Sequence, residues 1–526
     1  MIVDFRTLEN RSVIEADLCI IGAGAAGITV AREFVNSRLQ VVVIESGGFD
    51  PDPDTQSLYR GENVGVKYYP LEACRLRYFG GTTGHWSGQC SPLNEEDFQD
   101  RPWVPWSGWP ITKTELDPFY KRAHVIIGLG PYVYNDDVWR MVRMDGPRLD
   151  PTKLQVRFWQ FSRRLRFGQV YRQDIQNAPD VHVYLHANVV NIQTTRGGSA
   201  VDNVEIRTLE GKGGTVKAKI FVLATGAIEN ARLLLLSNRV EPTGIGNSSG
   251  LVGRFFMEHP EIDCGTVLPI HPAQFLETWR RQWLEDLIYL PGFRISPERQ
   301  MEEETLNCGA MITYDMDPDS GMKAVLDVAS SLKRTGKLPD HLWTKLWNVL
   351  TDLDDVAAGA YTYFVDKKEP LGRPTLVRIV GITEQAPNPQ SRVSLSEEKD
   401  RFGLNRPRLD WRLTELDKQG LSLLPRLMGT ELGRLNLGRV RLADWLQSNG
   451  FEAATGLRGG PHHMGTTRMS DDRKKGVVDP NCRVHGNANL YIAGGSVFPT
   501  SGYNMPTLTI VALALRLADH LKARLI

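Results

Sequence analysis

Two adjacent histidines near the C-terminus, His462 and His463, are of a residue type that could carry out proton chemistry. They follow Gly460 and Pro461 and precede Met464–Thr466, so we expect them in a loop. A neutral imidazole suits a general base, because its pKa lies near the working pH. A metal site is not expected here, since adjacent residues rarely chelate one ion together and no carboxylate flanks the pair. Their role depends on what the rest of the chain binds.

A glycine motif near the N-terminus links an expected strand to an expected helix. Gly22, Gly24 and Gly27 follow a short apolar run, and a second apolar run at 41–44 ends in Glu45. In such a unit the glycines permit a tight turn, the approach of a pyrophosphate to the backbone and close packing of the helix. The acid can take a ribose hydroxyl. The pattern predicts a dinucleotide site; a purely structural glycine turn is the alternative.

The flanking residues bear on which dinucleotide is bound. After Ile44 the chain continues through Gly47 into a loop able to lie along the cofactor, which favours FAD. A further strand closes in a turn that contains Ala224 and Gly226, and this turn offers a second backbone approach near the adenosine half. NAD stays open on these residues alone.

The bulk composition describes an ordinary globular protein. With 526 residues the chain is too long for one core, so we expect two domains, or one with an elaborate insertion. Lys plus Arg and Asp plus Glu number 62 each, which gives no sign of a nucleic-acid partner. Six scattered cysteines favour a reducing compartment, here the cytoplasm. No apolar run approaches the length of a membrane span, and the polar N-terminus does not resemble a signal peptide. Export to the periplasm with a signal-bearing partner would leave no mark in this sequence.

The pattern along the chain predicts an α/β fold with a second domain inserted into the first. Residues 50–125 look irregular, 181–224 look β-rich, and 507–521 form an apolar helix. We assign 1–261 and 456–526 to a Rossmann-type domain and 262–455 to a substrate domain. Within the latter, about 271–370 is expected to form an atypical helical insertion.

Several motifs in this order resemble the glucose–methanol–choline (GMC) oxidoreductase family. They are the glycine motif with Glu45, and the segments 222–237, 252–260, 462–470 and 476–521. The resemblance implies an FAD domain, a substrate domain built on an antiparallel sheet, and oxidation of an alcohol to a carbonyl. The segments 77–86, 109–112 and 384–396 look most like the branch with pyranose 2-oxidase, bacterial glycoside 3-oxidases and sugar dehydrogenases. That branch implies oxidation of a sugar or glycoside ring hydroxyl at C2 or C3.

The resemblance also implies roles for residues of the C-terminal motif. The family's base histidine stands in an H-x-x-G-T arrangement, which selects His462; His463 as the base and a structural pair are the alternatives. The family places a second polar residue, His or Asn, just before a Pro-Thr pair. Here that position holds Met505, and Asn504 comes one residue earlier. Either Asn504 reaches the substrate oxygen and steadies its charge, or Met505 faces the site; Asn504 as a helix cap is the structural alternative.

His85, before Trp86 in a glycine-rich loop, matches the place where some relatives attach the flavin covalently. A covalent bond and a non-bonded contact with the flavin are both open. With these residues, the full set expected to bind FAD is Gly22, Gly24, Gly27, Glu45, Gly81, Thr82, His85, Trp86, Val189, Ala224, Gly226, Gly495, Asn504, Pro506 and Thr507.

The expected insertion carries Leu342, Leu346, Val349 and Leu350 at helical spacing. Core packing or an oligomer contact is one interpretation; a lid or a docking face for an electron-transfer partner is the other. The expected partners are a sugar or glycoside, an acceptor (oxygen, a quinone or an electron carrier), and a second copy or a small subunit. Two other functions stay open: a non-sugar alcohol dehydrogenase, choline-like or aliphatic, and a flavin-binding protein without alcohol oxidation.

Overall fold

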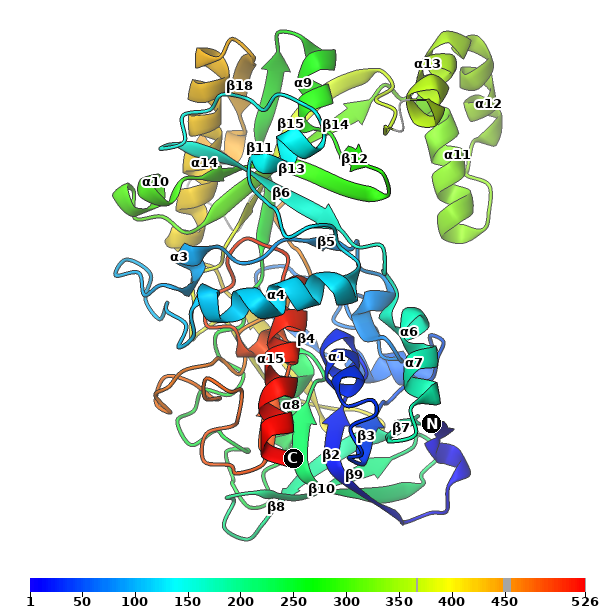
Figure 1. The fold of residues 1–526 in the computed structure, drawn as a ribbon, viewed down its shortest axis with the longest axis vertical. Helices are drawn as coiled ribbons and strands as arrows, with labels where there is room; N and C mark the ends of the chain where they lie inside the picture. Colours follow the sequence, from blue (N-terminus) through cyan, green and yellow to red (C-terminus); the bar gives the residue numbers. More distant parts are fainter. Residues whose placement is uncertain (366–367, 448–455, 526) are drawn as a thin grey trace.

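The computed structural model describes residues 1–365, 368–447 and 456–525, and Figure 1 shows their arrangement. The chain forms two large sheets with helices on them, one at each end of the long axis, a small third sheet, and a helical lobe beside the upper large sheet. No helix among these residues is long and apolar enough to cross a membrane.

The lower sheet has eight strands and is mostly parallel. Its order is β1-β7-β3-β2-β10-β9-β8, with β20 beside β10. All four residues of β3 are buried, as expected for an apolar strand inside a parallel sheet. The strands are β1 (Ile2–Asp4), β2 (Ser12–Ile21), β3 (Val41–Ile44), β7 (Val181–Leu185), β8 (Asn188–Thr194), β9 (Val201–Arg207), β10 (Gly213–Leu223) and β20 (Leu490–Ile492).

Helices cover this sheet and begin where its strands end. α1 (Ala25–Glu33) follows β2, α8 (Ala227–Leu236) follows β10, and α15 (Thr507–Leu525) follows the last strand. α15 packs against α1 and α4 (Lys113–Ile127). Several short helices complete the domain: α2 (Pro53–Gln56), α3 (Glu95–Phe98), α6 (Phe167–Val170) and α7 (Arg172–Asn177). Another short helix, α5 (Asp137–Met141), packs into the core of the upper sheet through Val138 and Trp139.

The upper sheet has nine strands, and its pairs are antiparallel. α14 (Glu415–Arg434) packs on it, and α9 (Pro272–Trp279) and α10 (Pro297–Glu302) lie in its connections. Its strands are β5 (Gln89–Cys90), β6 (Leu154–Phe161), β11 (Pro260–Pro269), β12 (Gln282–Leu284), β13 (Leu287–Ile295), β14 (Cys308–Met316), β15 (Pro374–Thr383), β18 (Gly438–Leu442) and β19 (Arg458–Gly459). A three-stranded sheet joins β4 (Glu62–Gly65), β16 (Arg392–Lys399) and β17 (Asn405–Trp411).

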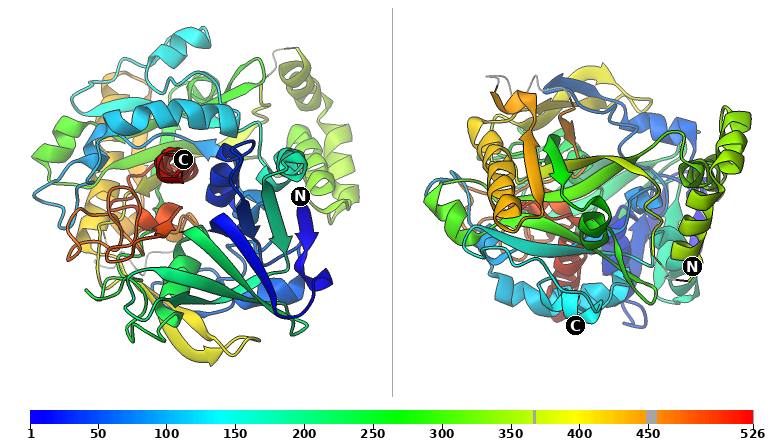
Figure 2. Two further views of the ribbon diagram at one scale, coloured as in Figure 1. Left: turned by 60° about the horizontal axis from the view of Figure 1, so that its bottom comes forward. Right: turned by 90° about the horizontal axis from the view of Figure 1, so that it is seen from above.

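The fold class expected from the sequence is confirmed, but some segments lie elsewhere than expected. β5 and β6 come from the part assigned to the Rossmann-type domain, yet they pair within the upper sheet. The expected helical insertion at 271–370 also contains the strands β12, β13 and β14. Its helical part is α11 (Gly321–Thr335), α12 (Leu342–Thr351) and α13 (Leu353–Phe364). These three helices form a lobe that projects to one side in both views of Figure 2.

Candidate FAD and substrate site

A cavity of about 670 Å³ opens between the two sheets, and most residues predicted for the site line it. The predicted residues on its wall are Gly22, Gly24, Glu45, Gly81, Thr82, His85, Trp86, Val189, Ala224, Gly226, His462, Gly495, Pro506 and Thr507. The loop that carries Gly81 is held on the first glycine turn, because the Gly80 N–H donates to the Ala23 carbonyl over 2.8 Å. Segments almost 500 residues apart in sequence thus share one cavity.

The three glycines of the first turn have distinct surroundings. A Cβ on Gly27 would lie 1.9 Å from the Gly22 carbonyl oxygen, so this glycine lets the helix pack on the turn and does not line the cavity. A Cβ on Gly24 would meet no atom within 4 Å, and the same holds for Gly226 and Gly494 on the cavity wall. The backbone is therefore bare where a phosphate or ring must approach closely.

Three helices, α1, α8 and α15, begin at this cavity with Ala25, Ala227 and Thr507 on its wall. The caps of α1 and α8 make no side-chain hydrogen bond, so their first N–H groups are free for an anion. Glu45 faces the cavity too, and one of its oxygens accepts from the Ala23 N–H over 2.8 Å. A long cavity with bare glycines, helix N-termini and this acid fits a dinucleotide such as FAD.

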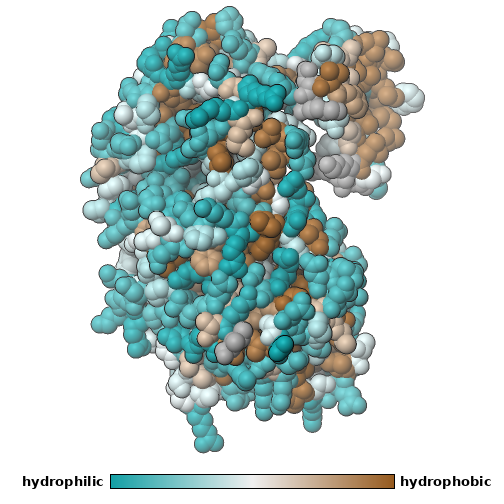
Figure 3. Space-filling model, in the orientation of Figure 1, coloured by the Kyte–Doolittle hydropathy of each residue, from teal (hydrophilic) through white to brown (hydrophobic). Residues whose placement is uncertain are grey.

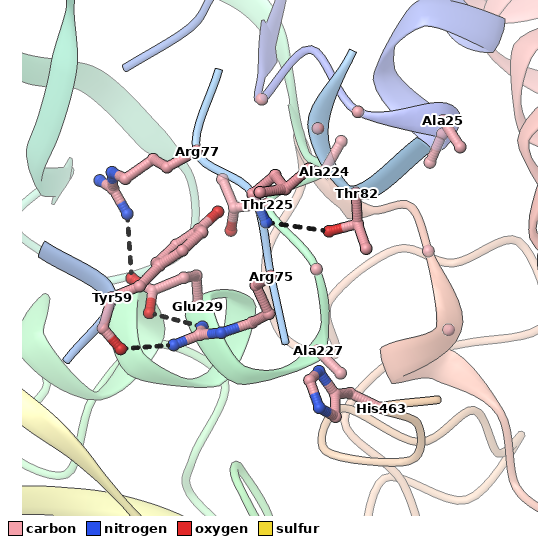
Figure 4. A pocket seen from close by; sticks show the side chains of 18 of the residues that line it. Ala25, Tyr59, Arg75, Arg77, Thr82, Ala224, Thr225, Ala227, Glu229 and His463 are labelled. Carbon is pink, nitrogen blue, oxygen red and sulfur yellow. Dashed lines mark hydrogen bonds and ion pairs between the residues drawn. The ribbon is translucent and has the colours of Figure 1, made fainter. Parts of the chain in front are cut away.

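A buried ion network that sequence reasoning missed forms another part of the wall. Glu229 accepts from Arg75 over 3.0 Å and from Arg232 over 3.2 Å, and Arg77 lies 3.6 Å away. Figure 4 shows Arg75 and Arg77 directed at Glu229, with Tyr59 beside them. Burial alone would raise the pKa of Glu229, but the arginines outweigh it and lower the pKa to about 2. Glu229 lies within the family motif 222–237, so the sequence did mark this segment. A role was assigned from the sequence, however, only to the glycine turn of that motif, which contains Ala224 and Gly226.

His462 and His463 lie on the cavity wall, and each contacts different partners. His463 Nε2 lies 2.9 Å from the Tyr68 hydroxyl, which in turn donates to Glu258. His462 Nδ1 lies 2.9 Å from Nδ1 of His259, a buried residue at the end of the motif 252–260. Burial is the main cause that lowers the pKa of all three histidines: to about 3 for His463, to about 4 for His259, and well below the usual value for His462. All three rings are therefore neutral near pH 7.

The contacts of His259 determine which nitrogen of His462 carries a proton. His259 Nε2 lies 3.4 Å from the Ser501 carbonyl oxygen, which can only accept a hydrogen bond. Neutral His259 is thus protonated at Nε2 and bare at Nδ1, so the proton between the two rings belongs to His462 Nδ1. His462 Nε2 is left bare, and no described residue engages it. Sequence reasoning overlooked His259, although it stands in a motif that carried the family resemblance.

Of the two residues before Pro506, the structure brings only one to the cavity wall. Met505 lines the cavity, whereas Asn504 does not. Asn504 is buried, and its Oδ1 accepts from the Ser91 hydroxyl over 2.6 Å. Its Nδ2 has no hydrogen-bond partner among the described residues. Asn504 therefore keeps one free donor next to the cavity wall.

His85 is exposed toward the cavity, directly after the short helix η3 (Gly81–Gly84). Burial of its ring, and then the charge of Arg166, lower the pKa of His85, so this imidazole is neutral and nucleophilic near pH 7. Trp86 is fixed beside it by a hydrogen bond from its indole to the Leu165 carbonyl and by an edge contact with Phe167. Among the described residues, no group of three or more His, Cys, Asp or Glu is arranged to hold a metal ion.

Fold and site together define a two-domain flavoprotein, with a Rossmann-type domain for FAD and a substrate domain on an antiparallel sheet. Comparison with known proteins shows what the chain is similar to. Residues 387–514 match the family described as GMC oxidoreductase. The chain is 23% identical to the fructose dehydrogenase large subunit of Gluconobacter japonicus, over 97% of this chain and 98% of that one. It is 26% identical to 6'''-hydroxyparomomycin C oxidase of Streptomyces lividus, over 96% and 92%.

Among solved structures, formate oxidase of Aspergillus oryzae RIB40 shares the fold with a TM-score of 0.57, 17% identity, and coverage of 98% of this chain and 99% of that chain. The chain is therefore similar to GMC oxidoreductases, FAD-dependent enzymes that act on alcohol CH–OH groups.

Proposed function

We propose that this enzyme oxidises a secondary ring hydroxyl, at C2 or C3, of a sugar or glycoside to a ketone. The observation that carries the proposal is the bare Nε2 of His462 on the cavity wall, with Nδ1 of the same ring fixed by His259. The sugar substrate is supported by the name of the fructose dehydrogenase relative. The ring position rests on the likeness of residues 77–86 to the pyranose 2-oxidase branch.

His462 acts as the general base and removes the hydroxyl proton at Nε2. Its neutral state near pH 7 leaves this nitrogen ready to accept, and His259 stabilises the ring by accepting at the opposite nitrogen. Asn504 does not line the cavity itself; turned toward it, its free amide donor would steady the negative charge that develops on the substrate oxygen. FAD, when bound, supplies the acceptor for the hydride that leaves the carbon.

The residues that hold FAD are those of the bare backbone and the helix N-termini around the cavity. Gly22, Gly24 and the start of α1 would hold the pyrophosphate, Glu45 would bind the ribose, and Val189 would contact the adenine. The flavin end would be held by Gly81, Thr82, Trp86, Gly495, Pro506 and Thr507, with His85 as the residue that could bond to it covalently.

The test is anaerobic mixing of the FAD-loaded protein with free sugars, glycosides and simple alcohols while flavin absorbance is followed. Bleaching by a sugar or glycoside, with a ketosugar as the product, is the expected result. Bleaching by alkanols or choline alone would overturn the sugar assignment and leave the chemistry in place. If no substrate bleaches the flavin, the chain binds FAD without oxidising alcohols. Admission of air after bleaching, and addition of quinones, then identifies the acceptor.

A further inference from the structure

The helical lobe, residues 321–365, presents apolar side chains to solvent. On α12, Trp343 is 83% exposed, and Trp347 and Leu350 are each 66% exposed. Leu346 belongs to the same stripe, because positions i, i+3, i+4 and i+7 share one face of a helix. α13 adds exposed Tyr361 and Phe364. Figure 3 shows this apolar surface as a continuous brown area over the outer side of the lobe. We call these six residues the lobe face.

The lobe face is not the wall of a core within the protomer. The buried clusters of the described residues draw members from both sheets, and none of them lies between 317 and 370. Of the four residues expected to form a stripe on α12, Leu346 and Leu350 are exposed, whereas Leu342 and Val349 are half-buried. The apolar side of the lobe therefore packs against no other described part of its own chain.

Polar contacts on the inner side hold the three helices in place. The Gly321 N–H donates to Asp352 over 3.0 Å, and the Met322 N–H donates to Asp355 over 3.0 Å. The Asn348 amide donates to the Pro318 carbonyl over 3.3 Å. Because these bonds fix the start of α11 against α12 and α13, the lobe face is a formed surface.

The area of this surface is sufficient for a stable dimer. An aromatic side chain offers about 150–250 Å². The four aromatic residues of the lobe face, Trp343, Trp347, Tyr361 and Phe364, are each more than half exposed and together present on the order of 500 Å². The exposed leucines of α12 and α13 bring the total toward the roughly 800 Å² that each partner buries in a standard interface. A typical monomer exposes no patch larger than about 300–600 Å².

Among the residues whose side chains the structure describes, the charges beside the lobe face are of both signs, so they form no basic patch that would attract an anionic lipid surface. Lys323 and Lys345 both pair with Asp327 and are not free for phosphate groups. Asp354 is 86% exposed and Asp340 is exposed as well, and both would be repelled by anionic lipid. The helical spacing of the stripe matches the packing of one helix against another.

We propose that the lobe face is the interface between two copies of this chain, in which α12 and α13 of each copy pack against those of the other. Such a contact is isologous, so the same patch on both copies buries itself and the assembly closes as a dimer. The interface lies outside the cavity, so dimerisation does not depend on the proposed substrate.

The experiment measures the molar mass of the full-length FAD-loaded protein by light scattering and sedimentation over a wide range of concentration. The variants are the double substitution Trp343→Glu with Trp347→Glu, the single substitution Leu350→Arg, and Val125→Glu as the matched control. Val125 is 70% exposed on α4 and lies outside the lobe. We expect wild type and V125E at twice the 59.0 kDa of one chain, and both lobe variants at 59.0 kDa. All four should bind FAD equally, because the exposed lobe side chains do not support the fold of the protomer.

Two results would overturn the proposal: a wild-type monomer at every concentration, or a dimer that survives both lobe variants. Sedimentation with phosphatidylcholine and phosphatidylglycerol vesicles is the companion assay. If wild type is monomeric and binds vesicles, and the double variant does not bind them, the lobe face is a lipid-binding surface and the dimer proposal is wrong.

Discussion

His259 Nδ1 lies 2.9 Å from His462 Nδ1, and the Ser501 carbonyl on the far side of His259 fixes the direction of the proton between them. This contact makes His259 a positioning residue for the proposed base. We expect His462→Ala to lower the rate of flavin reduction by about 10²–10⁴-fold, with FAD still bound, because the proton acceptor is lost.

His259→Phe keeps the volume of the ring and removes its acceptor, so both tautomers of His462 become accessible. We expect roughly a 10–100-fold lower rate of flavin reduction, a loss typical of partners that orient a histidine. His259→Asn returns an acceptor oxygen and should restore part of the rate. If His259 sets the tautomer of His462, its replacement by Phe should shift the pH–rate profile, whereas a merely structural change would leave the profile unchanged. An identical pH–rate profile in wild type and His259→Phe would therefore argue against a positioning role for His259.

Asn504 and Met505 are tested as a pair. Asn504→Ala should lower flavin reduction about 10²-fold if its amide stabilises the charge on the substrate oxygen. Met505→Leu, which keeps an apolar residue on the wall, should change the rate little. Met505→Asn places an amide on the wall itself and should rescue Asn504→Ala. Full activity of Asn504→Ala, together with a strong effect of Met505→Leu, would show that Met505 is the substrate contact.

Gly24 and Gly27 should respond differently to the same substitution. Gly24→Ala adds a Cβ that meets no protein atom, so the protein should fold normally and lose affinity for FAD. Gly27→Ala places a Cβ 1.9 Å from the Gly22 carbonyl oxygen and should destabilise the apoprotein by about 1–3 kcal/mol. Thermal unfolding of both apoproteins and FAD titration separate the two effects. Equal FAD affinity of Gly24→Ala and wild type would place the pyrophosphate elsewhere.

His85 decides whether the flavin is covalently attached. Acid precipitation of the FAD-loaded protein should leave yellow colour in the pellet for wild type. His85→Ala should release all flavin to the supernatant and still bind FAD reversibly, because the rest of the cavity is unchanged. Complete release from wild type would leave His85 as a non-bonded neighbour of the flavin.

The buried histidines predict that stability falls in acid. In the unfolded chain these rings take up protons below about pH 6.5, whereas the pKa in the folded state is about 4 for His259 and about 3 for His463. The unfolded state therefore binds more protons, and the free energy of unfolding decreases as pH drops below about 6.5. Each ring contributes on the order of 3 kcal/mol to this loss by pH 4.

Glu258 changes the free energy of unfolding in the opposite direction. Burial raises the pKa of its carboxyl to about 7, so the cost of burying the charged carboxylate disappears as the pH falls below this value. Denaturant titrations of wild type and His463→Gln between pH 7.5 and 5 measure the balance. The variant should lose less stability in acid than wild type. Identical pH slopes would show that His463 is not held neutral in the folded state.

The fold was predictable where one local pattern suffices. The glycine motif with its flanking apolar runs predicted β2, α1 and β3, because a buried parallel strand and a tight turn leave a strong sequence signal. α4 was missed within the stretch 50–125 that looks irregular. Its start was readable, since Thr112 and Glu115 form a capping box, but Pro118 and weak periodicity obscured it.

The sequence by itself indicated the family resemblance, the cofactor class and the candidate base, because these are carried by contiguous motifs with a local physical purpose. Only the tertiary structure decided which residues meet across the cavity. The pairing of His259 with His462 and the contacts of Arg75 with Glu229 join segments that are distant in sequence. Which of Asn504 and Met505 lines the cavity depends on the local course of the backbone, which the sequence does not fix. The outward direction of the α12 stripe was likewise undecided, since helical periodicity shows that residues share a face and not what that face contacts.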